Sequence, residues 1–316
     1  MKLFNQNQLK IKSLFERCHD LDLRCIMDLT PKKINHEIFY DISNIIHQAK
    51  EKKASIVLMM GAHVIRSGVQ RYIIDLMEKG FISCIAMNGA GLIHDYEFAL
   101  IGKTTESVSK YIKDGQFGLW KETGRINDLV CDAANMNKGL GEHIGYIIEN
   151  ENFEFRNISI LAAGSRLNIP VTIHVSIGCD IVHELPNCDG AAYGQTSYTD
   201  FLAFTHILEN LENGVVMNFG SAVMAPEVYL KALSMVRNVA QQSNKSIKKF
   251  VTLVCDLHDI QESYQKEAPK SNPFYYFRPW KTMLVRTVSD GGQSYYIKGK
   301  HKETIPELWT AINHQR

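Results

Sequence analysis

Short apolar runs recur along the chain without the alternation of polar and apolar positions that marks a half-exposed strand. Strands of a parallel sheet are covered on both faces, so they are apolar on both faces. The pattern therefore predicts buried strands at 55–60, 84–87, 169–177, 215–219, 250–256 and 282–288.

Between these runs, apolar residues recur every three or four positions, the period of a helix with one buried face. Ile38, Ile42 and Ile46, for example, fall on one stripe. Helices are expected over 36–53, 68–80, 141–153, 199–214 and 225–242. Alternating strands and helices predict an α/β fold with a doubly wound, mostly parallel sheet.

Two segments near the C-terminus lack this clear pattern. Polar residues and prolines dominate 261–273, which predicts a surface loop. An Asp-Gly-Gly turn in 290–301 leads into a strand, and a plain hairpin is the favoured interpretation. No domain boundary is evident, so we expect one domain over 1–316 with an N-terminal helical extension over 1–35.

Composition removes several classes of protein. Lys and Arg number 35 against 34 Asp and Glu, which gives no excess charge for nucleic acid or a membrane surface. No apolar run approaches the roughly 18 residues that span a bilayer, and the N-terminus lacks a secretory apolar segment. The seven cysteines form no CxxC pair, which is typical of free thiols. We expect a cytoplasmic protein.

Small or acidic residues follow five of the predicted strands. They are Gly61-Ala62-His63, Asn88-Gly89-Ala90-Gly91, Gly178-Cys179-Asp180, Gly220-Ser221-Ala222 and Asp256-Leu257-His258. Ligands of such sheets bind beyond the carboxyl ends of the strands, where small residues let backbone N–H groups approach a phosphate. One such turn alone is usually an ordinary connection between a strand and a helix, but five together favour a ligand site. Neither a GxGxxG fingerprint nor a P-loop is present.

The segment IVLMMGAHVIRSGVQRYIIDLMEKGFISCIAMNGAGLIHDYEFAL (56–100) resembles deoxyhypusine synthase. The resemblance continues through 167–185 and 215–223 and more weakly to the C-terminus, spanning roughly 30–314. It implies a sirtuin-like, Rossmann-like NAD-binding fold and a homotetramer with active sites across a dimer interface. It also implies chemistry in which an aminobutyl group from spermidine is captured by a lysine.

Position by position, the resemblance implies a set of cofactor-binding residues. These are Gly61, Ala62, His63, Asn88, Gly89, Ala90, Asp95, Gly220 and Ser221. Asp256 joins them as an acid at a strand end that suits ribose hydroxyls. His94 stands where the family commonly has glutamate, and Asp180 lies near an acidic ligand of cofactor or polyamine.

Two departures separate the chain from the family pattern. Ala225-Pro226-Glu227 stands where the family has basic and histidine residues, and KSNPFYYFRPW replaces the serine-rich stretch before the nucleophilic lysine. Lys281 is the lysine in reach of that position, although six extra residues then precede Ile305-Pro306. These changes argue against a protein substrate.

Oxidation and transfer of an amine would need a general base and carboxylates that bind the cationic amine. His94 is the candidate base, because imidazole titrates near working pH; the alternative is a helix cap. Asp180, Glu184 and Asp256 are candidates for binding an ammonium group, against the alternative of solvated loop carboxylates.

Lys281 is the candidate covalent acceptor. It follows an aromatic run in which Arg278 and Trp280 could hold a polyamine substrate. The alternative for Lys281 is a surface or phosphate-binding lysine beside Arg278, and the alternative for the aromatic run is ordinary packing at an interface. The stretch 174–184 contains His, Cys, Asp and Glu, but their spacing matches no standard zinc site, so no metal is expected.

Three functions remain open. The preferred one is an NAD-dependent transferase that oxidises an amine and passes an aminoalkyl group to an amine acceptor such as a small polyamine. The second is genuine deoxyhypusine synthase acting on a lysine of a translation factor. The third is a fold relative that binds a nucleotide without turnover.

Overall fold

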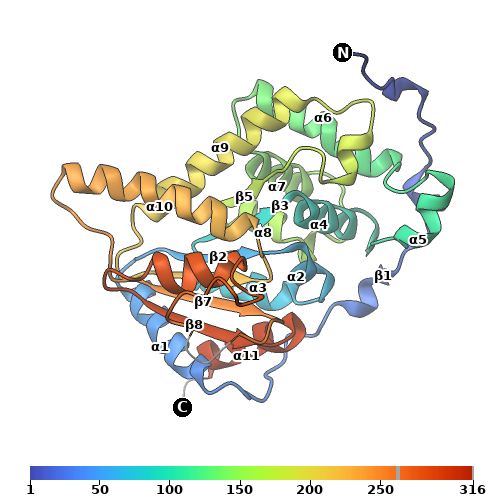
Figure 1. Ribbon diagram of the computed structural model, residues 1–316. Coiled ribbons are helices and arrows are strands. Elements are labelled where there is room, and N and C mark those ends of the chain that lie inside the picture. The colour runs from blue at the N-terminus through green and yellow to red at the C-terminus, as the bar shows by residue number, and fades with distance from the viewer. Residues whose placement is uncertain (261–263, 315–316) are drawn as a thin grey trace.

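The computed structural model describes residues 1–260 and 264–314 and contains one large sheet flanked by helices (Figure 1). Its strand order is β5-β3-β2-β6-β7-β8, and every neighbouring pair is parallel. The strands are β2 (Ile56–Met60), β3 (Cys84–Asn88), β5 (Val171–His174), β6 (Val215–Phe219), β7 (Val251–Asp256) and β8 (Gln293–Lys298). The predicted doubly wound α/β fold is confirmed.

Helices cover both faces of this sheet. They are α1 (Ile38–Glu51), α2 (Ala62–Arg66), α3 (Gln70–Glu78), α4 (Gly89–Ile101), α5 (Val108–Tyr111), α6 (Lys121–Asn135), α7 (Leu140–Asn150), α8 (Ile160–Leu167), α9 (Gly190–Leu208), α10 (Met224–Gln242) and α11 (His301–Asn313). Strand β2 shows why its sequence lacks alternation: Ile56 and Leu58 belong to one core cluster, whereas Val57 belongs to the other. The first cluster includes side chains of α1, α3, α4, α7, α8 and α11, and the second those of α9 and α10.

The segment 282–288, expected as a strand, is part of a π-helix, η7 (Pro279–Arg286). Its apolar side chains Trp280, Met283 and Leu284 pack into the second core cluster. Short apolar runs do not distinguish a strand from a buried helical turn, and this explains the error.

The last strand of the sheet is β8, which pairs parallel to β7, so the expected plain hairpin at 290–301 is also wrong. Of the expected surface loop 261–273, residues 261–263 lie outside the described part of the chain.

The N-terminal extension is helical only in three single 3-10 turns, η1 (Gln6–Gln8), η2 (Leu14–Glu16) and η3 (Leu23–Cys25). Its short strand β1 (Leu21–Asp22) pairs antiparallel with β4 (Lys103–Thr104), directly after α4. The extension therefore runs along one side of the molecule and reaches the end of α4 through this pairing (Figure 1). Among the described helices, none is long and apolar enough to span a bilayer.

The strand order reverses direction between β2 and β6. From β2 the chain continues to β3 and β5 on one side, and from β6 to β7 and β8 on the other. In open parallel sheets, the loops on either side of such a switch point diverge and leave a crevice at the carboxyl ends of the strands. This general rule points to the turns after β2 and β6 as the place to look for a ligand site.

Candidate functional site

Two glycines pack closely at the turns after β2 and β6. A Cβ on Gly61 would collide with the carbonyl oxygen of Gly220, and the Gly61 N–H donates to the carbonyl oxygen of Phe219 at 2.9 Å. Gly220 has φ +67°, and a Cβ there would meet the ring of His301. Close backbone packing at the switch point therefore requires both glycines.

Two of the predicted cofactor residues are helix caps. The Oδ1 of Asn88 accepts from the Gly91 N–H at 3.1 Å and begins α4. The Ser221 hydroxyl oxygen accepts from the Ala225 N–H at 3.0 Å in the first turn of α10. Both residues lie at the carboxyl ends of strands, as the sequence predicted.

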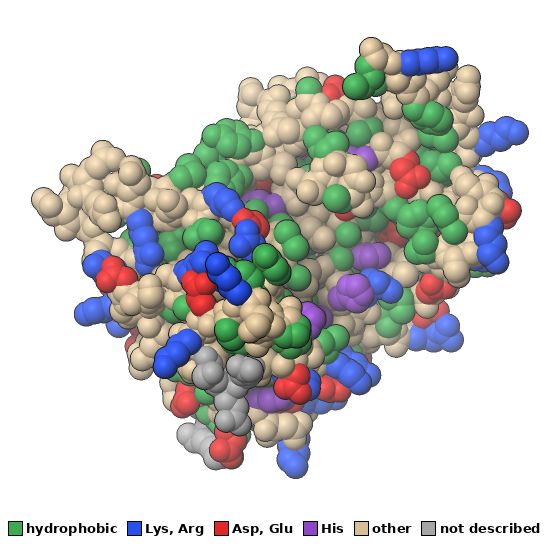
Figure 2. Space-filling model, viewed as in Figure 1, with side chains coloured by type: hydrophobic (Ala, Val, Ile, Leu, Met, Phe, Trp, Pro, Cys, Tyr) green, Lys and Arg blue, Asp and Glu red, His purple; other side chains and the backbone are tan. Residues whose placement is uncertain are grey.

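Two histidines lie close to these turns. His63 lies at the start of α2, with its Nε2 3.2 Å from Nη1 of Arg66, and His301 begins α11. Burial lowers the pKa of both imidazoles, and the neighbouring His63 lowers the pKa of His301 further. Asp256 ends β7, and its charge opposes that shift. Figure 2 shows histidine side chains gathered near the middle of this face.

A cavity of about 490 Å³ lies beside α4, where β3 and β5 end. Its walls come from α2, α4, the loop after β5, the segment 105–109 and the N-terminal extension. The charged residues that line it are Arg17, Asp20, Arg66, Glu97, Glu106 and Asp180, together with His94. Four carboxylates thus face two guanidinium groups, so the cavity carries a negative excess.

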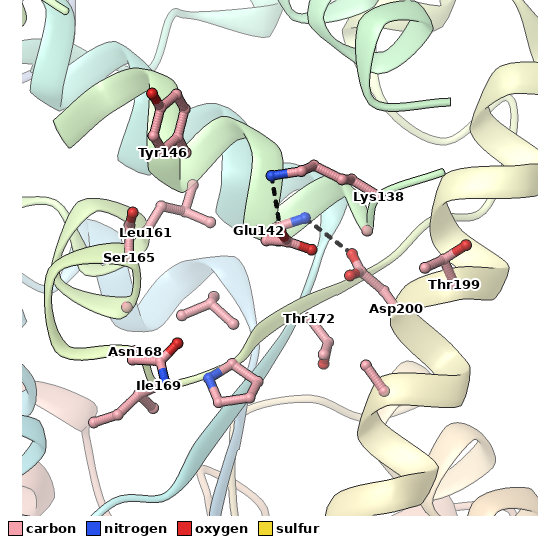
Figure 3. A pocket seen from close by; sticks show the side chains of 16 residues that line it. Lys138, Glu142, Tyr146, Leu161, Ser165, Asn168, Ile169, Thr172, Thr199 and Asp200 are labelled. Carbon is pink, nitrogen blue, oxygen red and sulfur yellow. Dashed lines mark hydrogen bonds and ion pairs between the residues drawn. The ribbon is translucent and has the colours of Figure 1, made fainter. Parts of the chain in front are cut away.

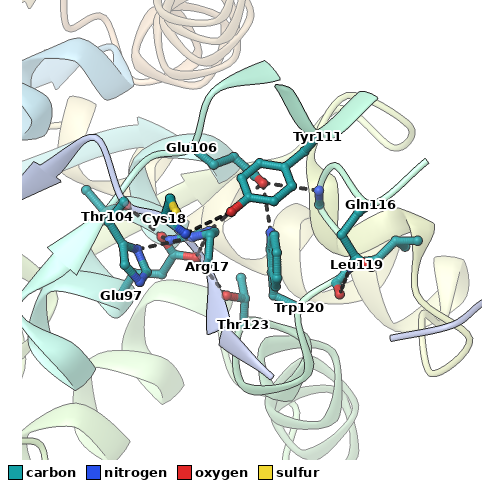
Figure 4. Close-up of polar contacts among 12 residues, drawn as sticks. Arg17, Cys18, Glu97, Thr104, Glu106, Tyr111, Gln116, Leu119, Trp120 and Thr123 are labelled. Carbon is teal, nitrogen blue, oxygen red and sulfur yellow. Dashed lines mark hydrogen bonds and ion pairs between the residues drawn. The ribbon is translucent and has the colours of Figure 1, made fainter. Parts of the chain in front are cut away.

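Glu97 is the centre of a buried polar network (Figure 4). Arg17 donates to both carboxylate oxygens, at 2.9 and 2.5 Å. The hydroxyls of Thr104 and Thr123 donate to it at 2.6 and 2.7 Å. Burial alone would raise the pKa of Glu97, but the Arg17 charge and the donated hydrogen bonds outweigh burial and hold this pKa below its usual value.

His94 adjoins this network, because its Nδ1 lies 2.8 Å from Oγ1 of Thr104. Burial lowers the pKa of His94 to about 4 against the opposing charge of Glu97. The imidazole is therefore neutral near pH 7, and the cavity is lined by its ring.

Three carboxylates near the cavity lack a full complement of partners. Asp180 makes no ion pair with any described residue, and burial raises its pKa to about 6. Glu106 is 7% exposed; its Oε1 accepts from Nε1 of Trp120 at 2.9 Å, but its Oε2 is buried with no hydrogen-bond partner in the described chain. Glu184 lies nearby, and burial together with the Glu106 charge raises its pKa.

Asp95 has to be reassigned from the cofactor site. It is 1% exposed and accepts hydrogen bonds from the Ser159 hydroxyl at 2.5 Å and from the N–H groups of Ile160 and Leu161 at 2.9 and 3.1 Å. A helix turns about 100° per residue, so the neighbour of His94 faces α8 rather than the cavity. Its carboxylate caps the start of α8.

Trp280 also has to be reassigned from the substrate site. It is 2% exposed, and its Nε1 donates to the carbonyl oxygens of Tyr264 and Lys266 at 2.9 and 3.0 Å. The ring belongs to the second core cluster, where no ligand can stack on it.

Lys281 and Arg278 lie on the same η7 segment and are engaged elsewhere. Nζ of Lys281 is 3.7 Å from Oε2 of Glu267 and 3.8 Å from the ring centroid of Tyr275. Nε of Arg278 is 2.7 Å from Oε1 of Glu227. The residues lining the cavity come from other segments, so the structure does not bring Lys281 together with His94.

Sequence reasoning missed most of the polar network. Glu97 lies three residues after His94 on one helix, a spacing that places both on the same face and could have signalled it. Arg17, Thr104 and Glu106 had no such signal. Arg17 reaches Glu97 from the distant N-terminal extension, and Glu106 contacts Trp120 and Arg17 rather than α4.

A second cavity of about 350 Å³ lies at the amino end of β5, between α7, α8 and α9 (Figure 3). Buried Asp200 accepts there from the N–H groups of Gly141 and Ile173 at 3.0 and 2.9 Å, and Lys138 pairs with Glu142 at 3.0 Å. This cavity is at the opposite end of β5 from the first cavity. In neither place do the described His, Cys, Asp and Glu side chains form a group of three able to hold a metal ion.

Comparison with protein families matches residues 34–173 to deoxyhypusine synthase. This range contains β2, β3, α4 and most of the cavity wall, so the resemblance seen in the sequence is confirmed there. Comparison with curated proteins finds no significant match.

Solved structures share the fold at low sequence identity. ArgZ, an arginine dihydrolase from cyanobacteria, is 13% identical with a TM-score of 0.50. The alignment covers 90% of this chain but only 34% of ArgZ, so this chain spans about a third of the length of ArgZ. A conserved protein assigned to the LOR/SDH group in Methanococcus maripaludis S2 is 16% identical, with 90% and 71% coverage and a TM-score of 0.50. A protein assigned as deoxyhypusine synthase in Entamoeba histolytica is 11% identical, with 88% and 87% coverage and a TM-score of 0.41.

Proposed function

We propose that this chain, a divergent relative of deoxyhypusine synthase over residues 34–173, is an NAD-dependent transferase. It oxidises an amine and passes the aminoalkyl group to an amine acceptor. The observation that supports this best is the negative cavity beside the strand ends, where Asp180 forms no ion pair with a described residue and Oε2 of Glu106 has no hydrogen-bond partner, although its Oε1 lies 4.0 Å from Arg17.

The residues that follow the carboxyl ends of the strands fit NAD. Small side chains at Ala62 and Ala90 leave room at two strand ends, as close approach to a phosphate requires. Arg66 has a buried Nε without a partner and forms no ion pair within the described residues, so its charge is available for a phosphate. His301 has a buried, unpartnered Nδ1 that suits a ribose hydroxyl.

When bound, NAD would take a hydride from the carbon beside the amine nitrogen and return it after a second amine has replaced the first. The chain's own part is to bind and orient the amines. Asp180 and Glu106 would hold ammonium groups, and Glu184 would add negative charge at the Glu106 end. His94 would accept a proton from the reacting nitrogen, since its imidazole is neutral.

The acceptor is a small amine in this proposal rather than a lysine of a protein. Lys281 is ion-paired on η7, whose apolar side chains pack in the second core cluster, whereas those of α4 pack in the first. A covalent role for Lys281 would require it to leave Glu267, so we favour direct capture by a free polyamine. From the resemblance we also propose a cytoplasmic homotetramer, which light scattering after gel filtration would test.

The first experiment is calorimetry of the purified protein with NAD, followed by NADH fluorescence after addition of putrescine or spermidine. We expect binding and a reduced-cofactor signal. Binding without reduction would favour the non-catalytic relative, and reduction that proceeds only with a protein lysine acceptor would favour genuine deoxyhypusine synthase. Absence of binding at millimolar NAD would overturn the proposal.

A further inference from the structure

We infer that Glu97 and Thr104 are positioning residues that fix His94 in one tautomer. In that tautomer Nδ1 carries the hydrogen, and the unprotonated Nε2 serves as a hydrogen-bond acceptor in the cavity, where it selects a ligand that donates N–H. The nature of the ligand rests on the proposed function, whereas the tautomer does not.

Glu97 fixes the direction of the chain of hydrogen bonds. Its carboxylate is buried and paired with Arg17 through both oxygens, so it is ionised and can only accept. The Thr104 hydroxyl has a single hydrogen and lies 2.6 Å from Oε2 of Glu97. That hydrogen is therefore committed to Glu97.

Thr104 can then only accept from His94. Its oxygen is 2.8 Å from Nδ1, and since its own hydrogen points to Glu97, Nδ1 must be the donor. The backbone of Thr104 is held by its pairing with Leu21 of β1, and its side chain is fully buried. The hydroxyl thus has a fixed place from which to orient the ring.

A neutral imidazole has one N–H, so Nε2 carries a lone pair. Burial keeps the ring neutral, with the charges of Arg66, Arg17 and His63 adding to this effect and that of Glu97 opposing it. No hydrogen bond from the described residues reaches Nε2. The cavity therefore presents an acceptor that an amine N–H satisfies and a carbonyl or ether oxygen does not.

The tautomer can be measured on the protein without cofactor. Long-range proton–nitrogen correlation spectra of histidine-labelled protein distinguish the two neutral forms, and His94→Gln assigns the signal. We expect the Nδ1–H form in the parent protein and in Thr104→Ser, and loss of that preference in Thr104→Val. Thr172→Val is the matched control, because Thr172 contacts another buried histidine, His174, at 3.1 Å.

An Nε2–H form in the parent protein would overturn the inference, and this outcome does not depend on whether Thr104→Val folds. An unchanged Nδ1–H form in folded Thr104→Val would overturn the role of Thr104.

Calorimetry with putrescine adds a second readout. Thr104→Val should weaken binding about tenfold, the factor expected for one misdirected hydrogen bond, whereas Thr104→Ser and Thr172→Val should not. Equal affinity in all variants would contradict a part for Nε2 in selection. If the parent protein binds no amine while His94 shows the Nδ1–H form, the proposed function fails and the assigned tautomer stands.

Discussion

His94 and Asp95 are adjacent in the sequence but act on different parts of the molecule. His94 faces the cavity and the Thr104 hydroxyl, whereas Asp95 faces the first turn of α8. One residue is thus available to a ligand, and the other holds two helices together. Substitutions at the two positions should separate binding from stability.

Asp95→Ala should lower the free energy of unfolding by about 3 kcal/mol, because three donors at the start of α8 lose a buried acceptor. Urea unfolding measures this, with Asp132→Ala on the exposed side of α6 as the control. His94→Gln should change stability by much less and abolish amine binding. A stable Asp95→Ala protein that has lost NAD binding would restore Asp95 to the cofactor site.

Binding of a cationic amine should depend on pH through Asp180. Burial raises the pKa of this carboxyl to about 6, so its negative charge is present at pH 7.5 and is lost as the pH falls through 6. Amine affinity should therefore decline below pH 6 in the parent protein. Calorimetry across this range should show a weaker, flatter profile for Asp180→Asn and an unchanged one for Asp132→Asn.

At the scale of elements, the N-terminal extension completes a site built mainly by α4. Arg17 comes from this extension and pairs with Glu97, and both side chains are 1% exposed. Removal of one partner of a buried ion pair leaves an uncompensated charge, which costs far more than breaking a surface pair.

Arg17→Met should therefore lower the free energy of unfolding by about 3–5 kcal/mol. Arg24→Ala, which breaks the exposed pair with Asp22 in the same extension, should cost less than about 1 kcal/mol. The double variant Arg17→Met/Glu97→Gln should recover part of the loss, since no charge is then buried alone. Chemical denaturation of the four proteins tests this, and equal effects of the two single substitutions would contradict it.

The η7 segment carries Lys281, the lysine that was the candidate covalent acceptor. Lys281→Ala should leave oxidation of the amine intact, because the lysine is paired with Glu267 and lies outside the cavity. Single-turnover NADH formation measures this step, with Lys270→Ala as the control. Loss of transfer with retained NADH formation would instead identify Lys281 as a covalent carrier.

Across the whole molecule, the sequence was sufficient for five strands of the sheet, β2, β3, β5, β6 and β7, and insufficient for β8 and for the cavity. Runs such as 56–60 and 215–219 are apolar because both faces are covered, so periodicity alone located these strands. The segment 282–288 failed because a buried π-helix has the same apolar density as a strand. The strand-end turns were found from their small residues.

The carboxylates of the cavity were harder to foresee. Arg17 and Glu97 are 80 residues apart, and nothing in either sequence neighbourhood indicates that they meet. Asp95 looked like a ligand residue because an acid beside a small-residue turn suits both a cofactor and a helix cap. Only the orientation of α4 about its own axis, which directs the Asp95 side chain towards α8, decides between these two roles.

The distance along the chain between Arg17 and its partners also has a consequence for the order of folding. Arg17 is synthesised well before Glu97, Thr104 and Thr123, so the extension has no binding site until α6 has left the ribosome. Long-range contacts of this kind form late, after local structure. We expect docking of the extension to be among the last steps of folding, and proteases acting on the nascent chain to cut first between residues 1 and 35.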